Sequence, residues 1–118
     1  PLMFRTEPPG ADAERRARQE EQAKLACPLI AANHARLDAG LAGREFLAGD
    51  FSAADIATFL QVHWALRLGG PSLRGLASLR RWYGSLAARP SFARVVAEIA
   101  AADRDLSHPV PGAFAGLD

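Results

Sequence analysis

The sequence predicts an all-α fold, a bundle of about four to five helices around one central helix. Three observations support this prediction. Apolar residues recur at helical spacing along most of the chain, whereas no strand-type alternation reaches a useful length. A complete helix-start signal occurs at residues 51–56, and proline or glycine residues separate the periodic segments.

The first helix is predicted to begin after an N-cap at Asp12 and to end at Gly40 or Gly43. Pro28 lies inside this segment. Because proline lacks a backbone donor and clashes with the preceding turn, we expect either a kink near residues 24–28 or two consecutive helices. The apolar stripe strengthens in the second half of the segment, at Leu25, Leu29, Ile30, Leu37 and Leu41.

The segment 51–56, with the sequence FSAADI, is typical of the start of a helix. With Ser52 as the N-cap, its hydroxyl accepts a hydrogen bond from the amide of Asp55, and the Asp55 carboxylate accepts one from the amide of Ser52. This is a capping box with Asp in the place of the usual Glu. Phe51 and Ile56 occupy the two positions of a hydrophobic staple. We expect Asp55 to be partly buried, for which its role in the cap is a sufficient reason.

The helix that follows this cap is predicted to be central, because its apolar residues cover more than one face. Gly69-Gly70-Pro71 ends it. A third helix is expected from about Leu76 to Ala88 and a last one from Phe92. Their apolar stripes are Leu76, Leu79, Tyr83 and Leu86 in the third helix, and Phe92, Val95, Val96 and Ile99 in the last. We predict one helical domain over residues 1–105 and an extended tail rich in Pro and Gly over residues 106–118.

The composition is that of an ordinary globular domain, with 49% hydrophobic and 23% charged residues in a chain of 118. The net charge of +1 gives no reason to expect a nucleic-acid partner, and no apolar run is long enough to span a membrane. Cys27 is the only cysteine, so no internal disulfide forms and we expect a cytoplasmic protein.

No residue is predicted to be catalytic. Cys27 has no histidine or acid at catalytic spacing, and we expect it to act as a small apolar residue. The three histidines, His34, His63 and His108, lack the spacing of metal ligands, so no metal site is expected. The arginines of residues 74–94 alternate with apolar residues and are interpreted as a solvated face.

Two segments carry a resemblance to a known family. Residues 46–56, FLAGDFSAADI, resemble the entry into the central helix of the C-terminal domain of glutathione S-transferases, and residues 86–92, LAARPSF, are similar to a later junction of that domain. The opening PLMFR is similar to the end of the preceding helix in bacterial, beta-like members. The chain departs from the family pattern at residues 74–77, which lack the usual proline, and at Pro28.

The resemblance implies that two domains of the protein have different roles. In this family an N-terminal thioredoxin-like domain binds glutathione and activates it, and nothing in this chain has the βαβ pattern of that domain. The helical domain lines the site for the hydrophobic co-substrate, to which Trp64, His63, Phe4 and Met3 would contribute. The alternative for Trp64 is a core position, and for His63 a position in the core or on the surface.

Two functions therefore remain open. The first is the C-terminal domain of a homodimeric glutathione transferase whose co-substrate is a hydrophobic electrophile. The second is a stand-alone, non-catalytic module that binds a protein or an apolar small molecule. The chain begins with Pro1 rather than methionine, so we expect that a segment was cleaved or that the chain is part of a longer protein.

Overall fold

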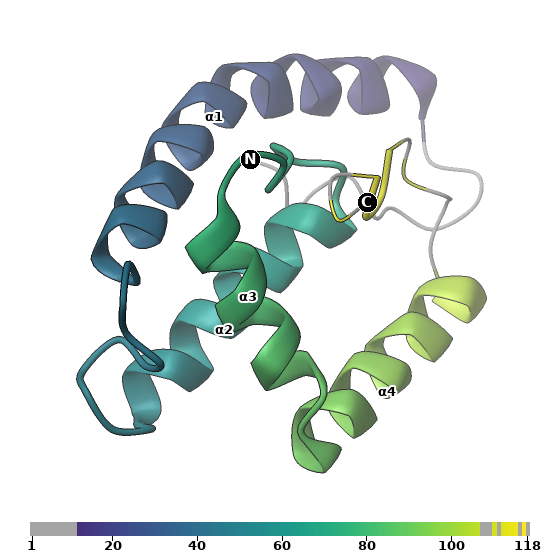
Figure 1. Ribbon diagram of the computed structural model, residues 1–118. Coiled ribbons are helices and arrows are strands. Elements are labelled where there is room, and N and C mark those ends of the chain that lie inside the picture. Colours follow the sequence, from purple (N-terminus) through teal and green to yellow (C-terminus); the bar gives the residue numbers. More distant parts are fainter. Residues whose placement is uncertain (1–11, 107–109, 111, 116, 118) are drawn as a thin grey trace.

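The structure is a computed structural model that describes residues 12–106, 110, 112–115 and 117. It contains four helices in the order α1 (Ala13–Gly40), α2 (Ala53–Arg67), α3 (Ala77–Ala87) and α4 (Pro90–Leu106) (Figure 1). Among the described residues the only β-type pairing is an isolated bridge between Ala48 and Asp50. The predicted all-α fold is confirmed. None of the described helices combines the length and the apolar character that crossing a membrane requires.

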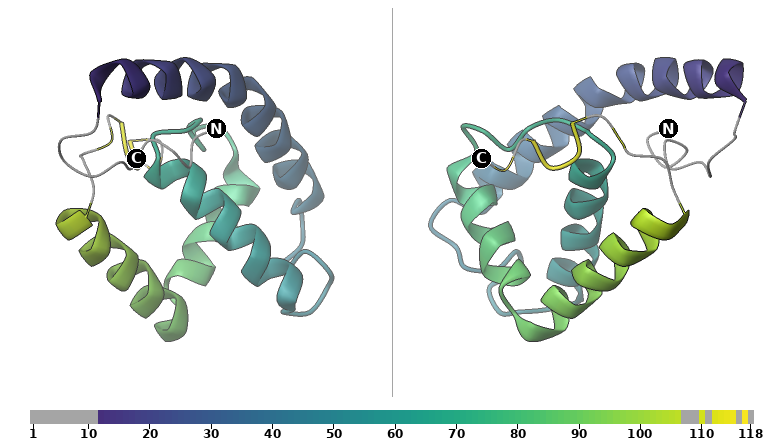
Figure 2. Two further views of the ribbon diagram at one scale, coloured as in Figure 1. Left: turned by 180° about the vertical axis from the view of Figure 1, so that it is seen from behind. Right: turned by 90° about the vertical axis from the view of Figure 1, so that its right-hand side faces the viewer.

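Helix α1 runs without a break past Pro28, so the sequence does not divide into two helices at this point. Figures 1 and 2 show instead that α1 bends between its two halves, as expected for a proline inside a helix. The carboxylate of Asp12 accepts a hydrogen bond of 3.0 Å from the amide of Glu14 and caps the first turn. The helix ends at Gly40, and Gly43 follows with a φ of 69°.

The core forms where α2 and α3 meet, and α3 also packs against α1 and α4. Most of its buried side chains are large and apolar, and each contributes roughly 1.5–3 kcal/mol when it is fully removed from water. The central cluster consists of Leu41, Phe59, Val62, Leu66, Leu73, Leu79, Trp82, Tyr83 and Leu86. Sequence periodicity identified Leu79, Tyr83 and Leu86 of α3.

One flank of α2 is exposed, although its sequence predicts a helix surrounded by others. Ile56, Leu60 and Trp64 are 44%, 43% and 41% exposed. These three residues are spaced by four and therefore lie on one side of the helix. Phe59, Val62 and Leu66 occupy the buried side. The second apolar face of α2 is thus an open surface within the described chain.

Helix α4 is attached more loosely than the others. None of its described residues is buried, and Phe92 and Val96 are the partly buried members of its apolar stripe that pack against the core cluster. Near its end, Asp103 forms a two-pronged ion pair with Arg67, the last residue of α2. This pair joins the far end of α4 to the central helix.

The tail was predicted to be extended, and its described residues correct this prediction. The amide of Phe114 donates a hydrogen bond of 2.9 Å to the carbonyl of Leu66, and its ring lies 5.3 Å from that of His63. Phe114 adopts a φ of 58°, which is uncommon for a residue with a side chain. Leu117 also packs against the core. The described part of this segment therefore turns back onto the core, with Gly112 and Phe114 at positive φ.

Candidate functional site

The capping box predicted at the start of α2 is present. The Asp55 carboxylate accepts a hydrogen bond of 3.1 Å from the amide of Ser52, and the Ser52 hydroxyl accepts one of 3.3 Å from the amide of Ala54. The two residues predicted to form the hydrophobic staple, Phe51 and Ile56, have different surroundings. Phe51 turns toward Phe46 and Phe92, with ring centroids 5.7 and 6.2 Å away, whereas Ile56 is 44% exposed.

Asp55 does more than cap α2. It is fully buried, and its carboxylate also accepts hydrogen bonds from the amide of Leu47 at 3.1 Å and from the indole Nε1 of Trp82 at 2.9 Å. One side chain therefore joins the loop before α2, the first turn of α2 and the middle of α3. From the sequence, the cap was a sufficient reason for the burial of Asp55. The structure shows that the cap accounts for only part of its hydrogen bonds.

The hydrogen bonds decide the ionisation of Asp55. Burial by itself would raise the pKa of this carboxyl, but the donors of Trp82, Leu47 and Ser52 together outweigh that effect and lower the pKa below 3.8. The carboxylate is therefore ionised at neutral pH and is held by a set of fixed donors. It is a structural anchor, because its acceptor positions face groups of the protein itself.

His63 lies in the core. It is 2% exposed, and its Nδ1 lies 2.8 Å from the hydroxyl oxygen of Tyr83. Its ring also stacks on Phe59 at 5.8 Å. Burial lowers the pKa of His63, with a smaller contribution in the same direction from the positive charge of Arg67, and burial raises the pKa of Tyr83 to about 12. The structure therefore shows His63 as a hydrogen-bonded histidine of the core, which is one of the alternatives that the sequence left open.

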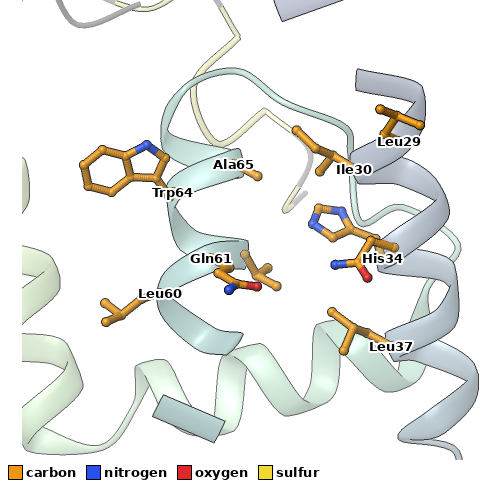
Figure 3. Close-up of a pocket in the computed structure, with 10 residues that line it drawn as sticks. Leu29, Ile30, His34, Leu37, Leu60, Gln61, Trp64 and Ala65 are labelled. Carbon is orange, nitrogen blue, oxygen red and sulfur yellow. The ribbon is translucent and has the colours of Figure 1, made fainter. Parts of the chain in front are cut away.

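An apolar groove runs between α1 and α2, with a volume of about 600 Å³. This volume lies within the range of small-molecule sites in proteins. Figure 3 shows the groove, with Ile30, His34 and Leu37 of α1 on one side and Gln61 and Ala65 of α2 on the other. Its complete lining, here called the α1–α2 groove, is Leu29, Ile30, Asn33, His34, Leu37, Leu60, Gln61, Val62, Trp64 and Ala65.

Trp64 lies at the rim of the α1–α2 groove. Its side chain is 41% exposed, and in Figure 3 it projects from the flank of α2 that faces away from α1, as does Leu60. The guanidinium of Arg67 lies 4.5 Å from the centre of the indole, at the distance of a cation–π contact. Trp64 is therefore a surface residue beside an apolar groove. The other two predicted contributors, Met3 and Phe4, lie outside the described residues.

His34 is a groove residue that the sequence did not single out as a site. It is 2% exposed, and its Nδ1 has no hydrogen-bond partner in the described chain. Burial lowers the pKa of this imidazole, so it is neutral at pH 7. A sequence signal existed, because His34 lies four residues after Ile30 and three before Leu37, on the apolar face of α1.

The groove is mostly apolar. Among the described residues that line it, the polar side chains are those of Asn33, His34 and Gln61, and none is an acid, a cysteine or a serine. Cys27 lies outside the lining and is half-buried. Within the described chain no three His, Cys, Asp or Glu side chains come together as metal ligands. Comparison with known proteins adds no assignment, since no family model, curated protein or solved structure matches this chain.

Proposed function

We propose that this chain is the helical C-terminal domain of a glutathione transferase, and that it supplies an apolar surface for the hydrophobic co-substrate. The observation that supports this proposal is the exposed Trp64 at the rim of the α1–α2 groove, on a helix that begins with the capping box of residues 52–55. The resemblance of residues 46–56 and 86–92 points to the same family.

In this proposal the helical domain positions the electrophile and performs no chemistry of its own. A thioredoxin-like domain would bind glutathione and stabilise its thiolate, while the indole of Trp64 offers a broad apolar wall to an aromatic acceptor. Holding two reactants in a productive orientation can by itself lower a barrier by several kcal/mol, on the order of 7–11 in favourable cases. The parent protein would be a cytoplasmic homodimer, without a nucleic-acid or membrane partner.

The experiment uses the protein in which this chain is joined to its thioredoxin-like domain. Conjugation of glutathione to a chloronitrobenzene is measured for the wild type, for Trp64→Ala and for the control Val95→Ala. Val95 is 44% exposed on α4 and lies outside the groove. We expect Trp64→Ala to raise the KM for the electrophile while the KM for glutathione stays constant. An unchanged KM for both substrates removes Trp64 from the co-substrate site.

The second candidate is a non-catalytic binding module, which the absence of acids and nucleophilic side chains from the groove lining favours. The coding sequence upstream of Pro1 separates the two candidates. An in-frame thioredoxin-like segment supports the transferase, whereas a start codon directly upstream supports the module. Size-exclusion chromatography with light scattering then tests the homodimer.

A further inference from the structure

We propose that the α1–α2 groove binds a neutral, apolar small molecule that carries one hydroxyl group, and that this hydroxyl forms a hydrogen bond with the imidazole of His34. The inference depends on the groove and not on glutathione chemistry. It holds for a domain of a transferase and for a stand-alone module alike.

The first argument is the unpaired nitrogen of His34. A buried polar atom without a partner is unfavourable, so such atoms are uncommon unless something else satisfies them. The Nδ1 of His34 is in this position, on a residue that is 2% exposed and lines the groove. Figure 3 shows the ring extending from α1 into the space between the two helices. A polar group of a ligand in the groove would satisfy it once the ring has turned Nδ1 toward the groove.

The second argument is the protonation state of that ring. Because burial lowers the pKa of His34, the imidazole is neutral at pH 7 and has one nitrogen that donates and one that accepts. A hydroxyl can serve either nitrogen, since it both donates and accepts. Nδ1 is covered in the structure, so pairing requires the ring to turn about its Cβ–Cγ bond. A half-turn about this bond exchanges the positions of Nδ1 and Cδ2 and so moves Nδ1 to the other edge of the ring.

The third argument excludes a charged ligand. The described residues that line the groove include no Lys, Arg, Asp or Glu, and seven of these ten residues are apolar. An ionised carboxylate placed among them would lose its hydration without gaining an opposite charge, which is unfavourable. A phenol or another neutral aromatic or aliphatic alcohol meets both requirements, because its body is apolar and its single polar group is uncharged.

The test compares three ligands of similar shape on the full chain: naphthalene, 1-naphthol and the anion 1-naphthoate. Affinities are measured by NMR titration, and the imidazole nitrogens are followed in long-range ¹H–¹⁵N spectra. We expect 1-naphthol to bind about two- to tenfold more tightly than naphthalene, the effect of one net hydrogen bond. We also expect naphthoate to bind most weakly and the ¹⁵N shift of His34 Nδ1 to move only with 1-naphthol.

Two variants identify the polar partner. His34→Leu should keep the affinity for naphthalene and lose the preference for 1-naphthol. Asn33→Leu removes another polar group of the same groove and should keep the preference. Far-UV circular dichroism and a thermal melt establish that both variants are folded before they are titrated.

Four results would overturn the proposal. They are equal affinities of the wild type for naphthalene and 1-naphthol, a preference that survives in His34→Leu, tightest binding of naphthoate, and no binding of any of the three ligands to a folded wild type. Loss of conjugation activity in the parent protein would count against the proposed function alone.

Discussion

Replacing Asp55 with alanine tests the structural centre of this domain. The substitution removes the Asp55 half of the capping box, and Ser52→Ala, which removes the other half, should cost about 0.5–2 kcal/mol. Asp55→Ala also leaves the Trp82 indole N–H and the Leu47 amide without their acceptor. Each buried donor without a partner costs about 1–3 kcal/mol, so the two donors and the lost cap together should cost about 2.5–8 kcal/mol. A domain of this size has a total stability of about 5–15 kcal/mol.

The assay is urea unfolding followed by circular dichroism at 25 °C, with Asp50→Ala as the matched control. Asp50 is an exposed acid five residues earlier, and its replacement should change the free energy of unfolding by less than about 0.5 kcal/mol. A double-mutant cycle of Asp55→Ala with Trp82→Phe isolates their hydrogen bond, because the volume lost at the indole appears in both backgrounds. We expect a coupling of about 1 kcal/mol or more.

Two outcomes would refute this reasoning. Equal costs for Ser52→Ala and Asp55→Ala would mean that the buried hydrogen bonds contribute nothing beyond the cap. Simple additivity of Asp55→Ala and Trp82→Phe would mean that the two side chains are not coupled. A pH series gives an independent check. Since the folded state lowers the pKa of Asp55, its contribution is fully present above pH 3.8 and is lost as the pH falls through the folded pKa.

Three further predictions use the same unfolding assay. Gly70→Ala should destabilise the fold by about 1–3 kcal/mol, because the new Cβ would lie 2.6 Å from the carbonyl oxygen of Ala65. Gly84→Ala should stabilise it by about 0.5–1 kcal/mol, because Gly84 lies in a helix and its Cβ would meet nothing within 4 Å. The opposite order of the two variants would contradict the packing at the end of α2. Asp103→Ala should lower the free energy of unfolding more than Glu98→Ala, because Asp103→Ala leaves the buried guanidinium of Arg67 unpaired, whereas Glu98→Ala breaks an exposed ion pair. Equal losses would show that the ion pair between α2 and α4 is not stabilising. Because burial lowers the pKa of His34 below 6.5, the free energy of unfolding should fall as the pH drops below about 6.5. His34→Leu should reduce this pH dependence. The same pH dependence in His34→Leu and in the wild type would show that other groups cause it.

The helices were predictable because their signals are local. Ser52 and Asp55 are three residues apart, and the box that they form needs no knowledge of the rest of the fold. The same holds for the glycine that ends α1 and for the apolar spacing of α3. The effect of Pro28 remained open, since the sequence permits either a break or a bend, and the structure shows one continuous helix through Pro28.

The candidate site was predicted only in part, because a groove is a property of two helices at a particular distance and rotation. Periodicity showed that α2 is apolar on two faces, but not that the face of Leu60 and Trp64 lies open. Likewise, the spacing on α1 gave the face of His34, but not that its Nδ1 is unpaired. The contact of Trp82 with Asp55 spans 27 residues, and no local pattern indicates such a pair.

The return of Phe114 to the core has a consequence for the order of assembly during synthesis. Its amide reaches the carbonyl of Leu66, and both Phe114 and Leu117 pack on the central cluster. A nascent chain that has emerged from the ribosome only as far as α4 therefore lacks the contacts that Phe114 and Leu117 make with the core, including the contact of Phe114 with the ring of His63. We expect ribosome-bound chains of that length to be cleaved rapidly by proteases, and resistance to arise once residue 117 has left the exit tunnel.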